Sequence, residues 1–181
     1  MNHGEAEAPF GLMAEYEGPE DLLDAAHKAY AAGFRKLDAF SPVPVHGLAA
    51  AIGFTRTNLP YVVFFCGLLG GIIGYGLQYW IHVIDYPLNI GGRPLHSGLF
   101  FIPVTFELTI LFAGISCFLS MLIANGLPLP YHPVFNVPGF SRASQDRFFL
   151  CVLHEDPQYD AESTRRFLES TRPSEVSEVD R

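Results

Sequence analysis

The sequence predicts an α+β membrane protein in which a two-helix transmembrane hairpin is inserted into one split, ferredoxin-like cytoplasmic domain. Two observations lead to this fold class. Two long apolar runs occupy the middle of the 181-residue chain, and the pattern strand, helix, strand occurs both before and after them. The predicted segments are, in chain order, an acidic tail at 1–9, the first half of the domain at 10–55, a span at 60–84, an outer loop at 85–97, a span at 98–124, a proline- and aromatic-rich strap at 125–147, and the second half of the domain with an acidic tail at 148–181.

The first half of the domain begins with a strand. In FGLMAEYE, apolar residues alternate from Phe10 to Tyr16 on one face, which predicts a half-buried strand. A helix is expected next, because Pro19 suits its first turn, the following acidic residues favour the positive end of the helix dipole, and Gly33 suits its end. RKLDAFSPVPV then predicts a second strand, which ends at the prolines from Pro42 onward.

The two apolar runs are each long enough to cross a membrane. Residues 60–84 carry no formal charge unless His82 is protonated, and residues 98–124 carry only Glu107. About 20 apolar residues span roughly 30 Å of hydrocarbon. Buried helices of a soluble core are the alternative, but such helices in a small protein are usually shorter and have a polar face.

The distribution of basic residues predicts the orientation of the spans. Arg56 precedes the first run, Arg142 and Arg147 follow the second, and the connecting loop contains only Arg93. Because cytoplasmic flanks carry the excess of Lys and Arg, both termini are expected in the cytoplasm. The acidic amino end also lacks the basic and apolar regions of a signal peptide, so this part of the chain is expected to stay where it is made.

Small residues mark one packing face of the first span. GLLGGIIGYG places glycines four residues apart, at Gly67 and Gly71 and again at Gly70 and Gly74, and this spacing favours close approach of another helix. That helix is either the second span or part of a larger membrane subunit. The small residues expected to receive the glycines in the second span are Ala113, Ser116, Cys117 and Ser120.

Glu107 is the residue of the second span whose insertion into a membrane costs the most free energy. A carboxylate within a span costs on the order of 3 kcal/mol unless it is protonated or paired. If the two span ends lie level, a neutral Glu107 hydrogen-bonded to Gln78 is one expectation. A contact or proton relay with a partner subunit is the other, and any proton route needs that partner because two helices cannot enclose an aqueous path.

The segment QYWIHVIDYPLNIGGRPLHS connects the spans and contains the remaining candidate polar contacts. His82, Asp85 and the more distant His96 supply at most three metal ligands, short of the four of a structural zinc site, which disfavours metal binding. Its aromatic residues suit a membrane interface and its prolines and glycines suit a tight turn. Arg93 is expected to pair with Asp85 or with a carboxylate of a neighbouring protein.

The strap and the second half of the domain complete the chain. NGLPLPYHPVFNVPGF interleaves prolines with aromatic residues, which predicts an extended segment without regular structure whose aromatics contact an interface or a partner. RFFLCVLHE then predicts a strand, DAESTRRFLEST a helix capped by Asp160, and SEVSEV a weaker strand. Neither half can bury a core alone, so the halves are expected to pair; two unstructured flanks are the alternative.

Composition and motifs disfavour several function classes. The net charge of −8 comes largely from the tails and argues against nucleic acid as a partner. The three cysteines form neither C-x-x-C nor C-x-x-C-H, so ligands for an iron–sulfur cluster or covalently attached haem are missing. There is no Ser/His/Asp ordering and no phosphate loop, which favours a subunit of a complex over an enzyme acting alone.

Long segments of the chain resemble a known family. GYGLQYWIHVIDYPLNIGGRPLHS, FIPVTFELTILF, GLPLPYHPVFN and SRASQDRFFL, with the amino-terminal GLMAEYEGPEDLL and the closing EVSEV, resemble the ActD family of bacterial alternative complex III. The resemblance covers nearly the whole chain. It implies an accessory subunit in the bacterial cytoplasmic membrane, within a complex that passes electrons from quinol to a periplasmic carrier such as cytochrome c.

The resemblance also implies where the cofactors and partners are. This chain is expected to bind no cofactor, whereas haem c, iron–sulfur clusters and quinol belong to a multihaem cytochrome subunit, an iron–sulfur subunit and polytopic quinol-binding membrane subunits. The lipid bilayer is the other expected partner. Two functional alternatives stay open beside the accessory role: direct participation in proton movement, and a membrane-tethered sensor whose ferredoxin-like domain binds a small ligand.

Overall fold

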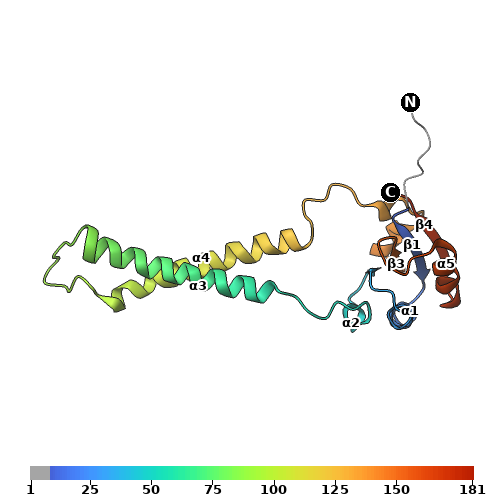
Figure 1. Cartoon of the computed structure of the whole chain (residues 1–181), viewed down its shortest axis with the longest axis horizontal. Coiled ribbons are helices and arrows are strands. Elements are labelled where there is room, and N and C mark those ends of the chain that lie inside the picture. The colour runs from blue at the N-terminus through green and yellow to red at the C-terminus, as the bar shows by residue number, and fades with distance from the viewer. Residues whose placement is uncertain (1–8) are drawn as a thin grey trace, which may run out of the picture. The chain divides into compact units, whose positions relative to one another are not determined.

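The computed structural model describes residues 9–181, which belong to two compact units (Figure 1). The sheet unit comprises residues 9–55 and 130–181, and the hairpin unit comprises Arg56–Leu129. The acidic tail predicted at 1–9 lies, apart from Pro9, outside the described residues.

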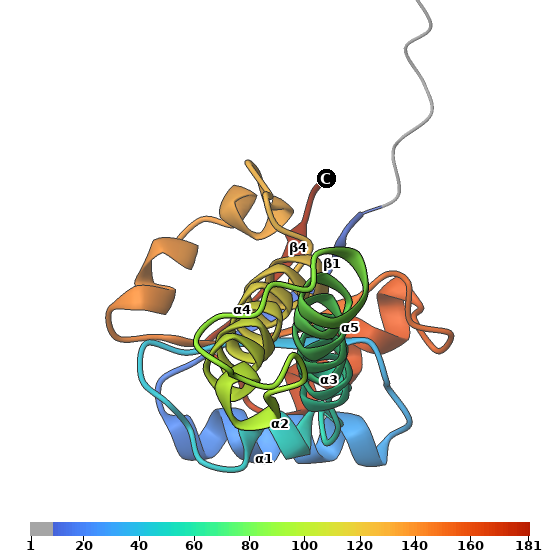
Figure 2. The same ribbon diagram turned by 90° about the vertical axis from the view of Figure 1, so that its left-hand side faces the viewer.

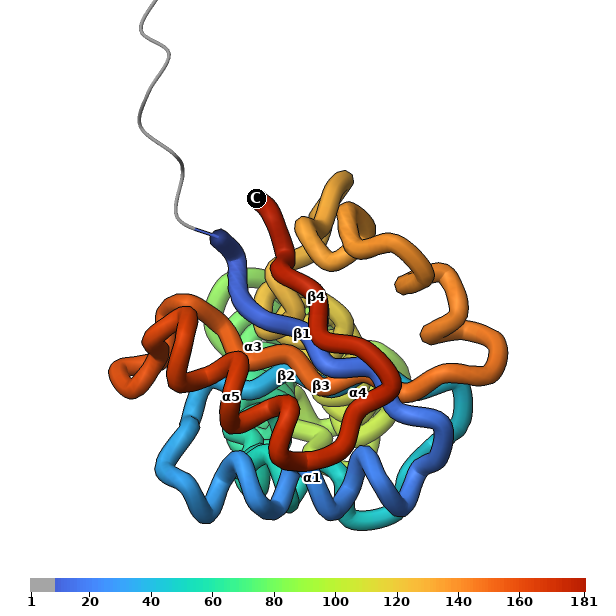
Figure 3. Tube along the Cα trace, turned by 90° about the vertical axis from the view of Figure 1, so that its right-hand side faces the viewer, coloured from blue at the N-terminus to red at the C-terminus, as the bar shows by residue number. Residues whose placement is uncertain are grey.

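A four-stranded antiparallel sheet forms the centre of the sheet unit, with the strand order β2-β3-β1-β4. The strands are β1 (Gly11–Tyr16), β2 (Leu37–Phe40), β3 (Phe148–Leu153) and β4 (Glu175–Val179). The two central strands come from opposite ends of the chain, and β1 lies between β3 and β4 (Figure 3). A mixed helix and sheet fold accompanied by two long apolar helices was predicted, and the structure confirms it.

Two helices cover one face of this sheet. Helix α1 (Pro19–Ala31) ends before Gly33, whose φ of 105° suits glycine, as the sequence predicted. Helix α5 (Ala161–Ser170) is capped by Asp160, whose carboxylate accepts a hydrogen bond from the Ser163 N–H at 2.9 Å. A short helix, α2 (Leu48–Ala51), adds two buried side chains that the sequence patterns did not indicate. The principal buried residues of this core are Leu12, Ala14, Tyr16, Leu22, Ala26, Leu48, Ala51, Leu150, Val152 and Leu168.

Residues 130–147 cover the other face of the sheet. Val134, Val137 and Phe140 are buried there against Met13 and Phe149. The prediction that β1 is half-buried is therefore wrong, because Met13 lies under this covering segment and is 1% exposed. The segment also contains two short 3₁₀ helices, Pro133–Asn136 and Phe140–Ser144, so the prediction that its prolines prevent regular structure is wrong as well. Proline suits the first position of such a turn, since its N–H needs no partner there.

Two long helices form the hairpin unit. Helix α3 (Leu59–Tyr79) continues as a π-helical segment, Trp80–Asp85, and helix α4 (Gly98–Ala124) packs along it (Figure 2). Leu59–Asp85 and Gly98–Ala124 each have 27 residues and are long and apolar enough to cross a membrane.

Glycines of α3 let α4 approach closely. A Cβ atom on Gly70 would lie 2.5 Å from the carbonyl oxygen of Leu108, and one on Gly67 would lie 3.4 Å from the Cβ of Ala113. The glycine spacing therefore serves packing within the chain. The small residues expected opposite the glycines are only partly correct: the nearest α4 atoms belong to Thr105, Leu108, Thr109, Phe112 and Ala113.

Candidate functional site

An aromatic cluster fixes the loop end of the hairpin. Phe101, at the first turn of α4, is 2% exposed. The His82 ring stacks on it with 5.6 Å between centroids, and the His96 ring lies 5.9 Å from it. The Tyr75 hydroxyl and His96 Nε2 share a hydrogen bond of 2.7 Å. The cluster thus ties the end of the connecting loop to both helices through two of the predicted candidate residues.

Gln78 joins the two helices by polar contacts. Its Nε2 lies 3.0 Å from the carbonyl oxygens of Gly74 and Phe101, and 3.2 Å from the Oγ1 of Thr105. These acceptors satisfy an amide that would otherwise be unpaired in an apolar surrounding. The sequence patterns singled out Gln78 but gave no sign of Phe101 or Thr105 as its partners.

Glu107 lies on the other side of α4. Its side chain is exposed, and within residues 9–181 no hydrogen bond joins it to Gln78. The expected Glu107–Gln78 hydrogen bond is therefore wrong. The reason is rotational: Thr105 faces α3, and two further residues at about 100° each turn Glu107 away from α3.

The loop charges do not pair with each other. Asp85 is exposed, and in the described part of the chain no ion pair joins it to Arg93. The guanidinium of Arg93 lies instead 5.8 Å from the centroid of the Phe100 ring, at the outer limit of a cation–π contact. The expected Arg93–Asp85 pair is wrong, whereas a contact of either residue with a neighbouring protein stays a prediction.

Metal ligands do not gather around these residues. Across residues 9–181, no group of three His, Cys, Asp or Glu side chains is placed to hold one metal ion. His82 and His96 contact Phe101 by their rings, and His96 has Tyr75 as its polar partner.

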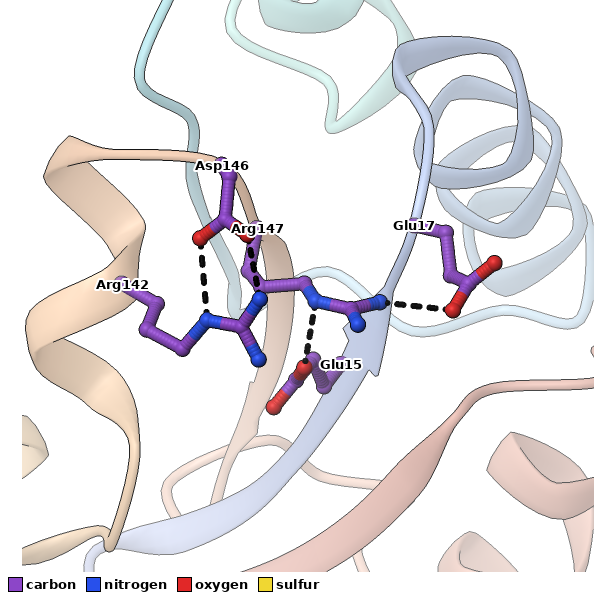
Figure 4. Close-up of polar contacts among 5 residues, drawn as sticks. All are labelled: Glu15, Glu17, Arg142, Asp146 and Arg147. Atoms are coloured by element: carbon purple, nitrogen blue, oxygen red, sulfur yellow. Dashed lines mark hydrogen bonds and ion pairs between the residues drawn. The ribbon is translucent and has the colours of Figure 1, made fainter.

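A pair of salt bridges in the sheet unit was not predicted. Arg147 Nε lies 3.2 Å from Glu15 Oε1, and Arg147 Nη1 lies 2.9 Å from Glu17 Oε1 (Figure 4). Since Tyr16 is opposite Phe148, Glu17 and Arg147 are the next pair in that strand register. The sequence feature that could have predicted a salt bridge here is the pair of opposite charges at facing positions just beyond the ends of β1 and β3.

Asp156 joins the loop after β3 to the residues before β2. Its Oδ2 accepts hydrogen bonds from the backbone N–H of Arg35 at 2.6 Å and of Lys36 at 2.7 Å, and its Oδ1 accepts from the Gln158 N–H at 2.9 Å. Burial raises the pKa of this carboxyl, but the backbone donors outweigh burial and hold its pKa below the ordinary value. The ionised carboxylate therefore stabilises the fold.

These features define a class of protein: a small α+β protein whose two long apolar helices occur between the second and third strands of one sheet. No curated protein matches the chain. Residues 10–178 match the family model described as alternative complex III, ActD subunit, and the chain belongs to this family. The resemblance recognised in the sequence is thereby confirmed.

Family membership makes the chain one subunit of a multisubunit complex of respiratory electron transport, so other subunits of that complex are its partners. Together with the two long apolar helices, it indicates a membrane protein. Of the functional alternatives drawn from the sequence, it favours those in which the chain works within the complex.

Proposed function

We propose that this chain is an accessory subunit, without cofactors of its own, that assembles and stabilises alternative complex III. The complex passes electrons from membrane quinol to a periplasmic carrier such as cytochrome c. Haem c, iron–sulfur clusters and quinol are bound by its multihaem cytochrome, iron–sulfur and polytopic membrane subunits. The observation that carries the proposal is the family match over residues 10–178, on a chain with two 27-residue apolar helices.

The proposed topology is a hairpin in the bacterial cytoplasmic membrane with both termini in the cytoplasm and the loop at 85–97 in the periplasm. The excess of Arg and Lys on the flanks of the helices supports this orientation. The strand order β2-β3-β1-β4 with helices after β1 and β3 supports a ferredoxin-like domain, into which the hairpin is inserted between β2 and β3.

The physical role follows from this arrangement. Strands β1 and β3 pair along six residues of each strand, although the hairpin separates them in the sequence. Pairing of the two chain segments fixes both ends of the hairpin to one folded domain. The chain thus provides a contact surface within the bilayer and another in the cytoplasm, and both are available to neighbouring subunits.

Deletion of this chain tests the assembly role. Membranes from a strain that lacks it are expected to contain less assembled complex and to reduce cytochrome c more slowly with quinol as the electron donor. The activity is expected to return when the full chain is supplied in trans. Undiminished amounts of assembled complex in the deletion strain would contradict an assembly role.

Participation in proton movement is a second candidate, and the carboxyl of Glu107 within an apolar helix favours it. Another subunit must supply the walls of such a route, because two helices enclose no aqueous path. Glu107→Gln is then expected to slow proton-coupled turnover without loss of assembly. Unchanged turnover together with unchanged pumping would exclude this role.

A further inference from the structure

We propose that the side of α4 that carries Glu107 binds a transmembrane helix of another subunit, and that this helix supplies a side-chain hydrogen-bond donor to Glu107. The inference rests on the proposed function, because it takes the hairpin to lie in the membrane as part of the complex. The surface, named the Glu107 face, consists of Pro103, Glu107, Leu111, Gly114 and Phe118.

The Glu107 face points away from the packing within the chain. Helix α3 meets α4 at Thr105, Leu108 and Phe112. Glu107 follows Thr105 by two residues, about 200° around the helix, and Gly114 follows Glu107 by close to two full turns. A Cβ atom added to Gly114 would meet no atom within 4 Å. The hairpin therefore folds without using this face.

Glu107 needs a partner that its own chain does not provide. It lies nine residues after Gly98, which places it about 14 Å along the helix, deeper than side chains at the helix ends that reach the interface. Within residues 9–181 it has no hydrogen bond or ion pair. Hydrocarbon offers no donor, so intramembrane carboxyls are usually paired with a polar group of the same or another chain.

The chemistry of the face indicates which kind of partner fits. Gly114 has no side chain, so a second helix can approach the α4 backbone closely there, two turns from Glu107. A second copy packed through the same face is a poor fit, because the only polar side chain it offers to Glu107 is another carboxyl, which donates a hydrogen bond only when protonated. The other residues of the face have no side-chain donor: Pro103, Leu111, Gly114 and Phe118. The family match shows that other subunits exist to supply a donor.

Two glycine variants of the full chain, expressed in place of the wild type, provide a matched test. Gly114→Leu adds a side chain to the Glu107 face, and Gly76→Leu adds the same side chain to an open position of α3, where a Cβ atom also meets nothing within 4 Å. Gly114→Leu is expected to lower the amount of complex retained by the tagged chain in detergent roughly tenfold, with little change for Gly76→Leu. Equal retention of the two variants would overturn the inference.

Two further measurements keep the result independent of folding. Glu107→Leu is expected to reduce retention of the complex, whereas Glu107→Gln, which keeps an acceptor oxygen, is expected to preserve most of it. A photo-reactive benzoylphenylalanine at Leu111 is expected to cross-link to a membrane subunit identified by mass spectrometry. Cross-links to lipid alone or to a second copy would overturn the inference. A wild-type chain that retains no complex would instead contradict the proposed function itself.

Discussion

Arg147 and Glu15 form an ion pair, with 3.2 Å between Nε and Oε1, that joins two chain segments separated in the sequence by the hairpin (Figure 4). Their side chains are 20% and 15% exposed, whereas those of the nearby Arg142–Asp146 pair are 41% and 55% exposed. Solvent screens the first pair less, so its loss is expected to matter more. The junction of β1 and β3 thus has an electrostatic contact in addition to its backbone ladder.

Arg147→Leu is expected to destabilise this junction. The change leaves the largely buried carboxylate of Glu15 without its cation, at an expected cost of about 1–3 kcal/mol in the free energy of opening of β1 and β3. Hydrogen exchange of the amides in these strands measures that free energy in the full chain. Arg142→Leu is the matched control, with a much smaller expected effect; similar effects of the two changes would show that shielding does not matter here.

Asp156 is expected to make the sheet unit sensitive to acid. Because its folded-state pKa lies below the ordinary value of 3.8, its stabilising contribution is fully present at neutral pH. The contribution starts to fall as the pH approaches about 4 and is lost as the pH drops through the lower folded-state pKa. Hydrogen exchange of the Arg35 and Lys36 amides, followed from pH 7 toward acid, measures this loss.

Asp156→Asn is expected to lower stability at pH 7 and to flatten that acid dependence, because the charged acceptor is gone. The exposed neighbour Glu155, changed to Gln, serves as the control and is expected to leave the acid dependence of the wild type in place. An Asp156→Asn chain as stable at pH 7 as the wild type would show that the three backbone donors do not depend on the carboxylate charge.

Gly70→Ala is expected to force α3 and α4 apart. The new Cβ atom would lie 2.5 Å from the carbonyl oxygen of Leu108 and 2.8 Å from the Cβ of Phe112. Such an overlap is expected to lower the stability of the helix pair by about 1–3 kcal/mol. The measurement is hydrogen exchange in the purified complex, which is expected to be faster in both helices. Gly76→Ala meets no atom and is expected to leave exchange unchanged. Equal exchange rates in the two variants would contradict the packing described here.

Tyr75→Phe is expected to loosen the end of the connecting loop. It removes the hydrogen bond to His96 Nε2 while keeping the ring against Phe101, so the expected loss is about 0.5–1.5 kcal/mol. Limited proteolysis of the loop measures the change. Tyr79→Phe is the control, because Tyr79 contacts His96 through its ring. Faster cleavage in the Tyr79 variant than in the Tyr75 variant would contradict the conclusion that the Tyr75–His96 hydrogen bond holds the end of the loop.

The sequence predicted those parts of the fold that depend on local chemistry. Pro19 begins α1, Gly33 with its positive φ follows the end of α1, and the Asp160 side chain caps α5. In each case the residue acts on backbone groups within a few positions of itself. Such effects can be recognised from spacing alone.

Contacts between distant segments were not predictable in the same way. Met13 lies on the opposite face of β1 from Leu12 and Ala14, and the alternating pattern does not show that residues 130–147 cover this second face. The direction in which Glu107 points depends on the rotation of α4 about its own axis relative to α3. If the predicted alignment of the two helices is wrong by two residues, the predicted direction of a side chain is wrong by about 200°. Tyr75 and His96 meet only because the loop returns to the first helix.

Purification of the native complex through a tag on this chain tests its proposed accessory role most directly. We predict that the tagged chain brings with it polytopic membrane subunits, an iron–sulfur subunit and a multihaem cytochrome in constant ratio. The chain itself, once separated from them, is expected to have no haem absorption in the visible range. Purification of the chain alone from intact membranes, or haem absorption that stays with the separated chain, would contradict this role.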